Sequence, residues 1–291
     1  MIDRAINDLT AYLSHLEQTF GLQISCHDFS ALTQTYAEQF SAFSAHLSPL
    51  CAAVKSDYRA FEQCRLHQYA LLSKCGKESF SGMCPCGVWE FVFPLTVGEI
   101  TVGFLSVSGY RSREKAALYR IRQTARRYGL AEDKLRQAFL KLNPELPRKE
   151  WLYVVLSVAA RLYELAYLAE YGEPLGPPAP PSAALYVNLY LLGYIREHFT
   201  EPLRVPQLAK LCHCSVSYIS HMFRKQNGVS LNTYINRLRL EHGRKLLRET
   251  RRSIREISDC CGFETPAYFS LLFREQFRCT PSGYRKIHGG R

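Results

Sequence analysis

The stretch Ser253-Ile-Arg-Glu-Ile-Ser-Asp-Cys-Cys-Gly-Phe-Glu-Thr-Pro-Ala-Tyr-Phe-Ser-Leu-Leu-Phe-Arg274 predicts two short helices joined by a tight turn. Ser253 and Glu256 have the spacing of a capping box, which begins a helix. Gly262 can adopt the positive φ of a sharp break. Thr265-Pro266 places an N-cap before a proline at the first helical position. This order is typical of a helix-turn-helix, whose second helix enters the major groove of DNA.

The same pattern occurs about fifty residues earlier in the chain. Nine positions of the earlier copy correspond to nine of the later one in the same order, seven of them with the same residue and two with a different aliphatic residue: Val205, Leu208, Cys212, Tyr218, Ser220, Phe223, Arg224, Gln226 and Tyr234 correspond to Ile254, Ile257, Cys261, Tyr268, Ser270, Phe273, Arg274, Gln276 and Tyr284. His213 stands where the later copy has Gly262, and histidine tolerates a positive φ better than most residues. The duplication predicts two helix-turn-helix units. An ordinary bundle of helical hairpins is the alternative.

Charge is distributed unevenly along the 291 residues, which contain 47% apolar and 12% aromatic residues and are therefore globular. Residues 185–291 contain 18 Lys and Arg against 8 Asp and Glu, whereas residues 1–184 contain 19 against 18. The boundary is a proline-rich segment, 172–184, which predicts a stiff, extended linker. A neutral half joined to a basic half indicates a nucleic-acid-binding domain attached to a second domain. A solvated basic surface would have the same composition.

Residues 185–291 resemble the DNA-binding domain of AraC/XylS-type transcription regulators. The resemblance rests on five stretches: Ser217-Tyr-Ile-Ser-His-Met-Phe-Arg-Lys225, Arg237-Leu-Arg-Leu-Glu241, Ile257-Ser-Asp-Cys-Cys-Gly-Phe263, Tyr268-Phe-Ser-Leu-Leu-Phe-Arg274 and Thr280-Pro-Ser-Gly-Tyr-Arg285. It implies an all-α double helix-turn-helix whose two units are joined by a long helix over about 231–249. Gly243 lies inside that helix, where it costs on the order of 1 kcal/mol relative to alanine.

The resemblance also implies which residues contact DNA. The base-reading positions match Val216, Ser217, Ser220 and His221 in the first helix-turn-helix, and Pro266, Ala267, Ser270 and Leu271 in the second. Thr265, the N-cap before the second set, is also expected among the DNA-binding residues. Serine and histidine can bond to base edges. Because the second set offers little more than apolar contact, we expect that unit to read DNA shape and phosphates. Arg224, Lys225 and Arg274 are the candidate phosphate contacts, although each could be a solvated surface charge.

The N-terminal domain, residues 1–171, mixes helices with a β-hairpin and is therefore of the α+β class. Helical spacing of apolar residues predicts helices over six ranges: 3–20, 31–47, 56–75, 113–128, 131–142 and 148–171. Between them, Trp89–Val97 and Ile100–Ser108 predict two strands that turn at Gly98. Pro94 favours an edge position or a bulge in the first strand.

This domain resembles the PocR-type sensory domain, which has a PAS-like fold. The residues that carry the resemblance are Leu50-Cys51, Cys64, Cys84-Pro-Cys-Gly87, Glu90, Pro94 and Gly103-Phe-Leu-Ser106. It implies a pocket for a small organic ligand, such as the short diol to which the namesake responds, or a polyol. We expect the ligand site to comprise Cys51, Cys64, His67, Cys84, Cys86, Trp89 and Glu90. The alternative is that these residues only pack the core.

The cysteines allow a second interpretation of this domain. Cys64, His67, Cys84 and Cys86 are soft ligands at short spacings, which could hold zinc or an iron–sulfur centre or could sense redox state. Their spacing matches no strong metal motif, so the sequence assigns no definite cofactor. An alkylation-repair methyl acceptor joined to an AraC-like domain is a weaker alternative, because its paired cysteines are more widely spaced. No catalytic constellation stands out, and we predict that the protein is not an enzyme.

The sequence therefore predicts a transcription regulator, with activation favoured over repression, that binds double-stranded DNA and a small-molecule effector and acts on RNA polymerase. Residues 1–8 lack the basic start and apolar run of a signal peptide, which predicts a cytoplasmic protein without a membrane span. Within the helix expected over 148–171, the stretch Trp151–Leu156 is apolar nearly all round, and this predicts a homodimer formed through that helix. The alternative is a helix buried within its own domain. Leu152 and Leu156 are the residues expected at the dimer contact.

Overall fold

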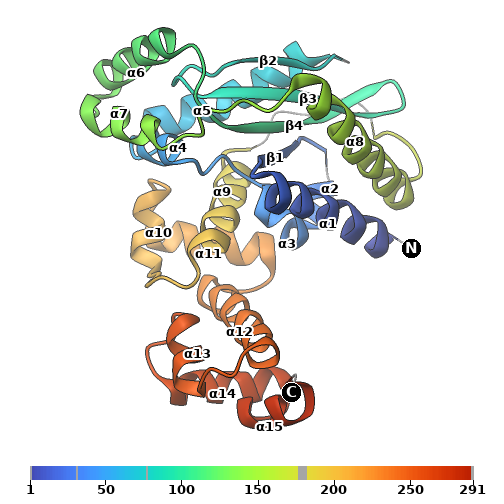
Figure 1. The fold of residues 1–291 in the computed structure, drawn as a ribbon, viewed down its shortest axis with the longest axis vertical. Helices are drawn as coiled ribbons and strands as arrows, with labels where there is room; N and C mark the ends of the chain where they lie inside the picture. Colours follow the sequence, from blue (N-terminus) through green and yellow to red (C-terminus); the bar gives the residue numbers. More distant parts are fainter. Residues whose placement is uncertain (1, 31, 77, 176–181, 290–291) are drawn as a thin grey trace. The chain divides into compact units, whose positions relative to one another are not determined.

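The computed structural model describes residues 2–30, 32–76, 78–175 and 182–289, and the chain divides into two compact units, residues 1–193 and 194–291 (Figure 1). The elements of the first unit are α1 (Ile2–Phe20), β1 (Gln23–Asp28), α2 (Leu32–Thr35), α3 (Ala37–Phe40), η1 (Ser41–Phe43), α4 (Pro49–Val54), α5 (Tyr58–Cys75), β2 (Phe80–Met83), β3 (Trp89–Val97), β4 (Ile100–Tyr110), α6 (Glu114–Tyr128), α7 (Glu132–Leu140), α8 (Lys149–Tyr171) and the first part of α9 (Ala183–His198).

The sheet of the first unit is antiparallel, with the strand order β1-β4-β3-β2. The predicted hairpin is present as β3 and β4, and β4 runs two residues beyond the expected end, to Tyr110. The strands that flank the hairpin, β1 and β2, were not predicted from the sequence. Both are short, and β1 carries polar residues such as His27 and Asp28 that do not form an apolar alternation.

The missing N–H group of Pro94 is tolerated because β2 is short. Although β3 lies between two strands, β2 pairs only with Trp89 through Val92, so Pro94 lies beyond the last paired residue. A register shift between β3 and β4 follows at Leu95 and Thr96. The proline therefore occupies a local edge next to an irregularity, where a missing donor costs no ladder hydrogen bond.

The two faces of the sheet pack against different helices. Because side chains alternate along a strand, Phe91 and Phe93 of β3 join a core with α1 and α8. Glu90 and Val92 belong to the opposite face, which α5 covers. A further small core forms where α4, α6 and α7 meet. Of these four β3 residues only Glu90 is charged. It lies on the face of the sheet that α5 covers, and a cavity is built on that face.

The prediction of one continuous helix over 31–47 is wrong for residues 32–47. Residue 31 lies outside the described residues. The chain instead forms α2, α3 and the 3-10 turn η1. The Ser41 hydroxyl donates to the Glu38 carbonyl, and the Ser44 hydroxyl donates to the Ser41 carbonyl. Such local side-chain bonds compete with helix continuation. The other predicted helices of this unit are confirmed within two residues at each end.

The second unit is entirely helical in its described residues. It contains the end of α9 and α10 (Val205–Leu211), α11 (Val216–Asn227), α12 (Leu231–Glu249), α13 (Ile254–Cys260), α14 (Pro266–Phe277) and α15 (Pro281–His288). Ser253 and Glu256 form the predicted capping box, and Thr265 caps α14 with Pro266 at its first position. His213 and Gly262 both adopt a positive φ, of 55° and 80°. The two turns are therefore built alike, and the long helix α12 joins them over the predicted range.

The proline-rich segment does not coincide with the division between the two units. The division falls inside α9, because the first part of that helix packs against the first unit: Phe61 lies 5.1 Å from Tyr186 and 5.2 Å from Tyr190 between ring centres. Residues 176–181, which hold four of the linker prolines, lie outside the described residues. The domain bounds 1–171, 172–184 and 185–291 stay a prediction.

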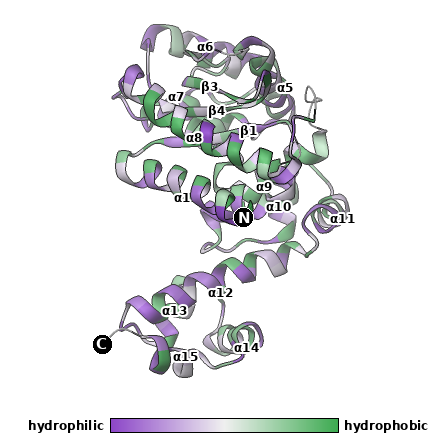
Figure 2. Cartoon of the chain, turned by 90° about the vertical axis from the view of Figure 1, so that its right-hand side faces the viewer, coloured by the Kyte–Doolittle hydropathy of each residue, from purple (hydrophilic) through white to green (hydrophobic). Residues whose placement is uncertain are grey.

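Helix α8 is long and apolar enough to cross a membrane by length and composition alone, a test that the core helix of a soluble protein also passes. It packs against α1 and β3, and Leu152 and Leu156 are fully buried in that core. The expectation that these two leucines form a dimer contact is therefore wrong. The apolar residues that α8 leaves exposed are Tyr153, Val154, Val158 and Leu165. In Figure 2, apolar and hydrophilic residues alternate along α8 and α12, as in helices with one face on a core.

Gly243 of α12 is required by a neighbouring ring, and we predict that Gly243→Ala destabilises the protein. A Cβ atom there would lie 2.9 Å from Cε2 of Phe269, which is fully buried and cannot move cheaply. Overpacking of this kind costs about 1–3 kcal/mol, more than the helix propensity that alanine adds. Thermal unfolding followed by circular dichroism should show a lower midpoint for Gly243→Ala. The exposed α12 substitution Asn232→Ala should leave the midpoint unchanged; a Gly243→Ala protein as stable as wild type would contradict the packing.

Candidate functional site

The two recognition helices, α11 and α14, have equivalent packing in the second unit. In the first copy Phe223 meets Tyr234 edge to face at 5.6 Å between ring centres, and in the second copy Phe273 meets Tyr284 at 5.7 Å. Ile219 and Phe269 are fully buried at matching positions. The sequence duplication is therefore a structural one, with each second helix held by the same aromatic contact.

The residues predicted to contact DNA lie on the outer faces of these helices. In α11, all six are exposed: Val216, Ser217, Ser220, His221, Arg224 and Lys225. In and before α14, Thr265, Ala267, Leu271 and Arg274 are exposed, whereas Pro266 and Ser270 are half-buried. Two of the hydroxyls already have partners within the protein. Ser220 donates to the Val216 carbonyl at 2.7 Å, and the Thr265 side chain accepts from the Tyr268 amide at 3.2 Å.

A second candidate site is a cavity of about 30 Å³ in the first unit. Its walls come from the segment before α4, from α4 and α5, from the β2–β3 turn and from the start of β3. The lining residues are His46, Cys51, Val54, Lys55, Cys64, His67, Gln68, Cys84, Cys86, Val88 and Glu90. Helical spacing explains two of the walls, because Cys51 and Lys55 are four residues apart on and just after α4, and Cys64 and Gln68 are four apart on α5.

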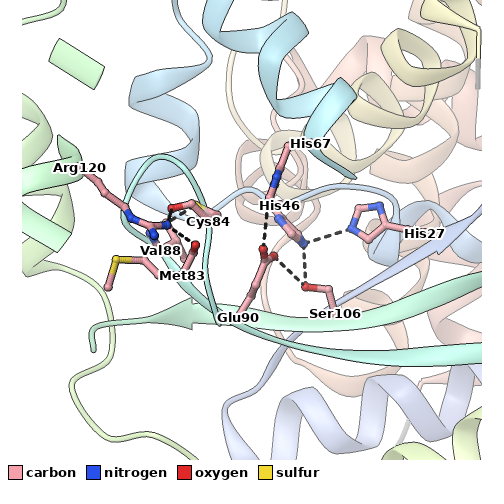
Figure 3. Close-up of polar contacts among 9 residues, drawn as sticks. All are labelled: His27, His46, His67, Met83, Cys84, Val88, Glu90, Ser106 and Arg120. Atoms are coloured by element: carbon pink, nitrogen blue, oxygen red, sulfur yellow. Dashed lines mark hydrogen bonds and ion pairs between the residues drawn. The ribbon is translucent and has the colours of Figure 1, made fainter. Parts of the chain in front are cut away.

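The Cys84-Pro-Cys-Gly87 stretch forms the tight turn between β2 and β3. The Cys84 amide donates to the Val88 carbonyl at 2.8 Å, and the Gly87 amide donates to the Cys84 carbonyl at 3.0 Å. Gly87 has a φ of 96°, and a Cβ atom at this position would lie 3.0 Å from the backbone oxygen of Ala117, so a larger residue does not fit. Arg120 of α6 donates to the carbonyls of Met83 and Cys84 (Figure 3). The turn thus holds both of its thiols at the cavity wall.

A chain of polar contacts links three residues of the cavity wall, His46, His67 and Glu90, through Ser106 and continues to His27 (Figure 3). His67 Nε2 lies 3.4 Å from Glu90 Oε1, and the Ser106 hydroxyl donates to Glu90 Oε2 at 3.5 Å. The Nε2 atom of His46 lies 3.1 Å from Ser106 Oγ and 3.2 Å from Nε2 of His27. Burial lowers the pKa of His27 to about 3 and that of His46 well below its ordinary value, and the charge of Lys55 acts in the same direction. Both imidazoles are therefore neutral at pH 7.

Three thiols that line the cavity, those of Cys51, Cys64 and Cys84, are held in their protonated form. Burial raises the pKa of Cys51 to about 12 and also raises that of Cys64. The pKa of Cys84 is raised well above its usual value, first by its contact with Cys86 and then by burial. The thiolate is the nucleophile and the metal ligand in cysteine chemistry. These side chains thus behave as small, weakly polar groups that suit an organic ligand.

The structure brings together six of the seven residues predicted for the ligand site: Cys51, Cys64, His67, Cys84, Cys86 and Glu90 all line the cavity. Trp89 does not, since it packs edge to face on Tyr110 beside the core of α1 and α8. Five further lining residues were not predicted from the sequence: His46, Val54, Lys55, Gln68 and Val88. Helical spacing from Cys51 and Cys64 could have pointed to Lys55 and Gln68, but His46 lies in an irregular segment that carries no such signal.

The four candidate metal ligands, Cys64, His67, Cys84 and Cys86, do not form a recognisable centre. Across the residues that the structure describes, no three His, Cys, Asp or Glu side chains are placed to hold one metal ion. All eleven cysteines are unpaired thiols.

Two known families match the chain. The family described as the sensory domain found in PocR matches residues 5–164, and a helix-turn-helix domain family matches residues 208–287. The first match covers the unit that contains the cavity, and the second covers both recognition helices. The PocR and AraC-type resemblances expected from the sequence are confirmed.

Individual relatives are similar to one or both parts of the chain. The uncharacterised helix-turn-helix-type transcriptional regulator YijO of Escherichia coli (strain K12) is 36% identical over 44% of this chain and 45% of its own. The regulatory protein PocR of Salmonella typhimurium is 25% identical over 83% of each chain. The solved DNA-binding domain of AdpA, in complex with a target DNA, is 25% identical over 34% of this chain and 90% of its own, with a TM-score of 0.34. The chain spans about half the length of the first curated relatives that it matches.

The protonated state of the cavity thiols predicts slow alkylation in the native protein. At pH 8, iodoacetamide should label the exposed Cys260 rapidly, whereas Cys51, with a pKa of about 12, should react only after unfolding. Mass spectrometry of peptides from native and urea-unfolded protein measures both rates. Labelling of Cys51 as fast as that of Cys260 would contradict the site and would favour a redox or metal role.

Proposed function

Because the chain belongs to the AraC-type helix-turn-helix regulators that carry a PocR-type sensory domain, we propose that it activates transcription at specific DNA sites under the control of a small molecule bound in the sensor cavity. The observation that carries this proposal is the coexistence of two solvent-facing recognition helices with a cavity lined by polar and apolar side chains in the other unit. A cytoplasmic location and contact with RNA polymerase follow from the same proposal.

DNA binding is supported by the outward-facing residues of α11 and α14. His221 and Ser217 are exposed near the start of α11, where a recognition helix meets base edges. Ser220 is a weaker candidate for base contact, because its hydroxyl already donates to the Val216 carbonyl. In α14 the corresponding exposed residues are Ala267 and Leu271. The helix-turn-helix that contains α11 therefore reads sequence, and the one that contains α14 reads shape, thymine methyl groups and phosphates.

The ligand that suits the cavity is a small organic molecule with hydroxyl groups, such as a short diol or polyol. Glu90 offers a buried acceptor, and His67 and Gln68 offer further hydrogen-bonding groups beside apolar Val54 and Val88. Hydroxyls donate well to a carboxylate in such a site, and the apolar wall accommodates the carbon skeleton. A redox role would require thiolates, and the raised pKa values of Cys51, Cys64 and Cys84 oppose it.

Helix α9 is the segment through which the cavity would act on DNA binding. Lys55, a lining residue, lies under the ring of Tyr190 at 4.8 Å from Nζ to the ring centre. The Ser44 Oγ atom, which lies near the Ser41 carbonyl, is also 2.7 Å from the Leu189 carbonyl oxygen of α9, so that its one hydrogen is shared between the two acceptors. A ligand that moved Lys55 would therefore press on α9, and it would shift DNA affinity only by as much as its affinity differs between the two arrangements.

A homodimer through α8 remains part of the proposal, on a different face from the one first expected. Val154, Val158 and Leu165 are exposed at spacings of four and seven residues, with Arg161 between them paired to Glu164. Positions 154, 158, 161 and 165 follow the alternating spacing of four and three residues of a helix that packs on a second copy of itself, with Arg161 as the one charged residue of this stripe.

The proposed DNA contacts of α11 predict that two of its substitutions change DNA affinity in different ways. His221→Ala should weaken binding to the preferred site by about 1–3 kcal/mol while leaving binding to random DNA unchanged, because a base contact carries sequence information. Arg224→Ala should weaken both equally and reduce the salt dependence, because phosphate contacts release counterions. Fluorescence anisotropy of the full chain with labelled duplexes at several salt concentrations measures this. A full chain that binds no duplex even at low salt would remove the central proposal.

The proposed dimer contact on α8 leads to a prediction: the wild-type protein is a dimer, and the double substitution Val154→Glu and Val158→Glu makes it a monomer. Both side chains are exposed, so the double variant should fold normally while a charge is placed in the seam. Multi-angle light scattering of the full chain gives the mass of each protein. Lys115→Glu, an exposed substitution on α6, serves as the control and should remain dimeric. A wild-type protein that is monomeric at high micromolar concentration would contradict the proposal.

A further inference from the structure

Residues 1–184, nearly neutral as a whole, contain one strongly basic segment. Residues 111–150, which include α6 and α7, have 12 Lys and Arg against 5 Asp and Glu, whereas the rest of residues 1–184 has 7 against 13. The helix-turn-helix units do not account for this charge, because the segment belongs to the first unit. Charge of one sign gathered in one segment attracts molecules of the opposite charge.

A surface groove of about 680 Å³ lies at the C-terminal end of α6. Its walls come from α5, from the turn between β2 and β3, and from the last two turns of α6. Arg120 of α6 donates to the carbonyls of Met83 and Cys84 and so holds this turn (Figure 3). Small-molecule sites usually have volumes of about 300–1,000 Å³. The residues of the groove that bear on its chemistry are Gln63, Cys86, Gln123, Arg126, Arg127 and Tyr128.

The charge of the groove is positive and is not balanced by its own walls. Arg126 and Arg127 are both exposed there, and no Asp or Glu is among the described residues that line the groove. Within the part of the chain that the structure describes, neither arginine is paired with a carboxylate. Arg122, one turn earlier, differs from them because its Nε atom lies 3.4 Å from Oε1 of Glu132. The two groove arginines are therefore available to an anion from solution.

The ring of Tyr128 gathers further positive charge at the groove. The Cζ atom of Arg127 lies 5.6 Å from the ring centre, and that of Arg59 lies 5.7 Å from it, both within the reach of a cation–π contact. Arg59 has a carboxylate partner, since its Nε atom is 3.5 Å from Oδ1 of Asp57. The repulsion among neighbouring guanidinium groups falls when an anion occupies the groove.

We propose that this groove binds a small molecule that carries a phosphate or diphosphate group. Guanidinium groups bind phosphate through paired, charge-assisted hydrogen bonds. The side-chain amides of Gln63 and Gln123 can donate to further phosphate oxygens. The site is distinct from the effector cavity, although Cys86 lines both. It does not depend on the proposed function, because it requires neither DNA binding nor an occupied cavity.

Pyrophosphate is the probe, because it presents two phosphate groups to two arginines. Isothermal titration calorimetry of the full chain should detect binding, and the double substitution Arg126→Gln and Arg127→Gln should raise the dissociation constant by about tenfold or more, because charge-assisted hydrogen bonds are lost. Both side chains are exposed, so the variant should fold, which circular dichroism checks. If it does not fold, Arg126→Gln alone gives the same comparison.

A matched control removes the same amount of charge outside the groove. Lys115 of α6 and Lys134 of α7 are exposed and do not line it. The double substitution Lys115→Gln and Lys134→Gln should change the dissociation constant by no more than about twofold at an ionic strength of about 0.15 M, where distant surface charges are screened. An equal loss of affinity in this control would show general attraction by charge and would overturn the proposal.

A phosphate of the DNA backbone has the same chemistry, and a second titration separates the two sources. Fluorescence anisotropy with a duplex of random sequence should give the same affinity for the arginine variant and for the lysine control. A selective loss of duplex affinity in the arginine variant would assign the groove to DNA and overturn the proposal of a small molecule. Wild-type protein that binds no pyrophosphate, or a folded arginine variant that binds it as tightly as wild type, would also overturn it.

Discussion

The arrangement of the sensor follows from the burial of one carboxylate, Glu90, inside a β-sheet domain. A charge there is tolerated only if hydrogen-bonding groups converge on it. His67 from α5 and Ser106 from β4 do so, and Ser106 continues the contact to His46 and His27. This chain of polar groups ties α5, two strands and the segment before α4 together. The hydrogen bonds from His67 and Ser106 to Glu90 are longer than ideal, so the Glu90 carboxylate keeps the capacity to accept a hydrogen bond from a ligand.

The DNA-binding unit depends on local signals, and for that reason the sequence predicts it well. A capping box at Ser253, an N-cap at Thr265 and a positive φ at Gly262 are each set by residues within one or two turns. The duplication then supplies the second copy, with His213 in place of the glycine. Gly243, which helix propensity alone counts as a cost, is explained only by a long-range contact, the approach of the Phe269 ring.

The sensor was less predictable because its site is assembled from segments far apart in the chain. The cysteines and Glu90 could be selected by residue type and Lys55 by its helical spacing from Cys51, but His46 reaches the cavity from the irregular segment before α4. The same limit explains the errors. Trp89 is next to Glu90 in sequence and faces the other core, and Leu152 and Leu156 are buried in α8 by α1 and β3, which periodicity alone does not show. Serine side chains that bond to the backbone at Ser41 and Ser44 likewise ended a helix that the apolar pattern had extended.

The central claim is that occupancy of the cavity and binding to DNA are coupled, and linkage tests it most directly. An effector that changes DNA affinity by a given factor must have its own affinity changed by DNA by the same factor. The measurement is a pair of titrations on the full chain: DNA affinity with and without saturating effector, and effector affinity with and without saturating DNA. The account predicts equal factors of about 5–150, the usual range of allosteric coupling. A DNA affinity that is unchanged by saturating effector would contradict it.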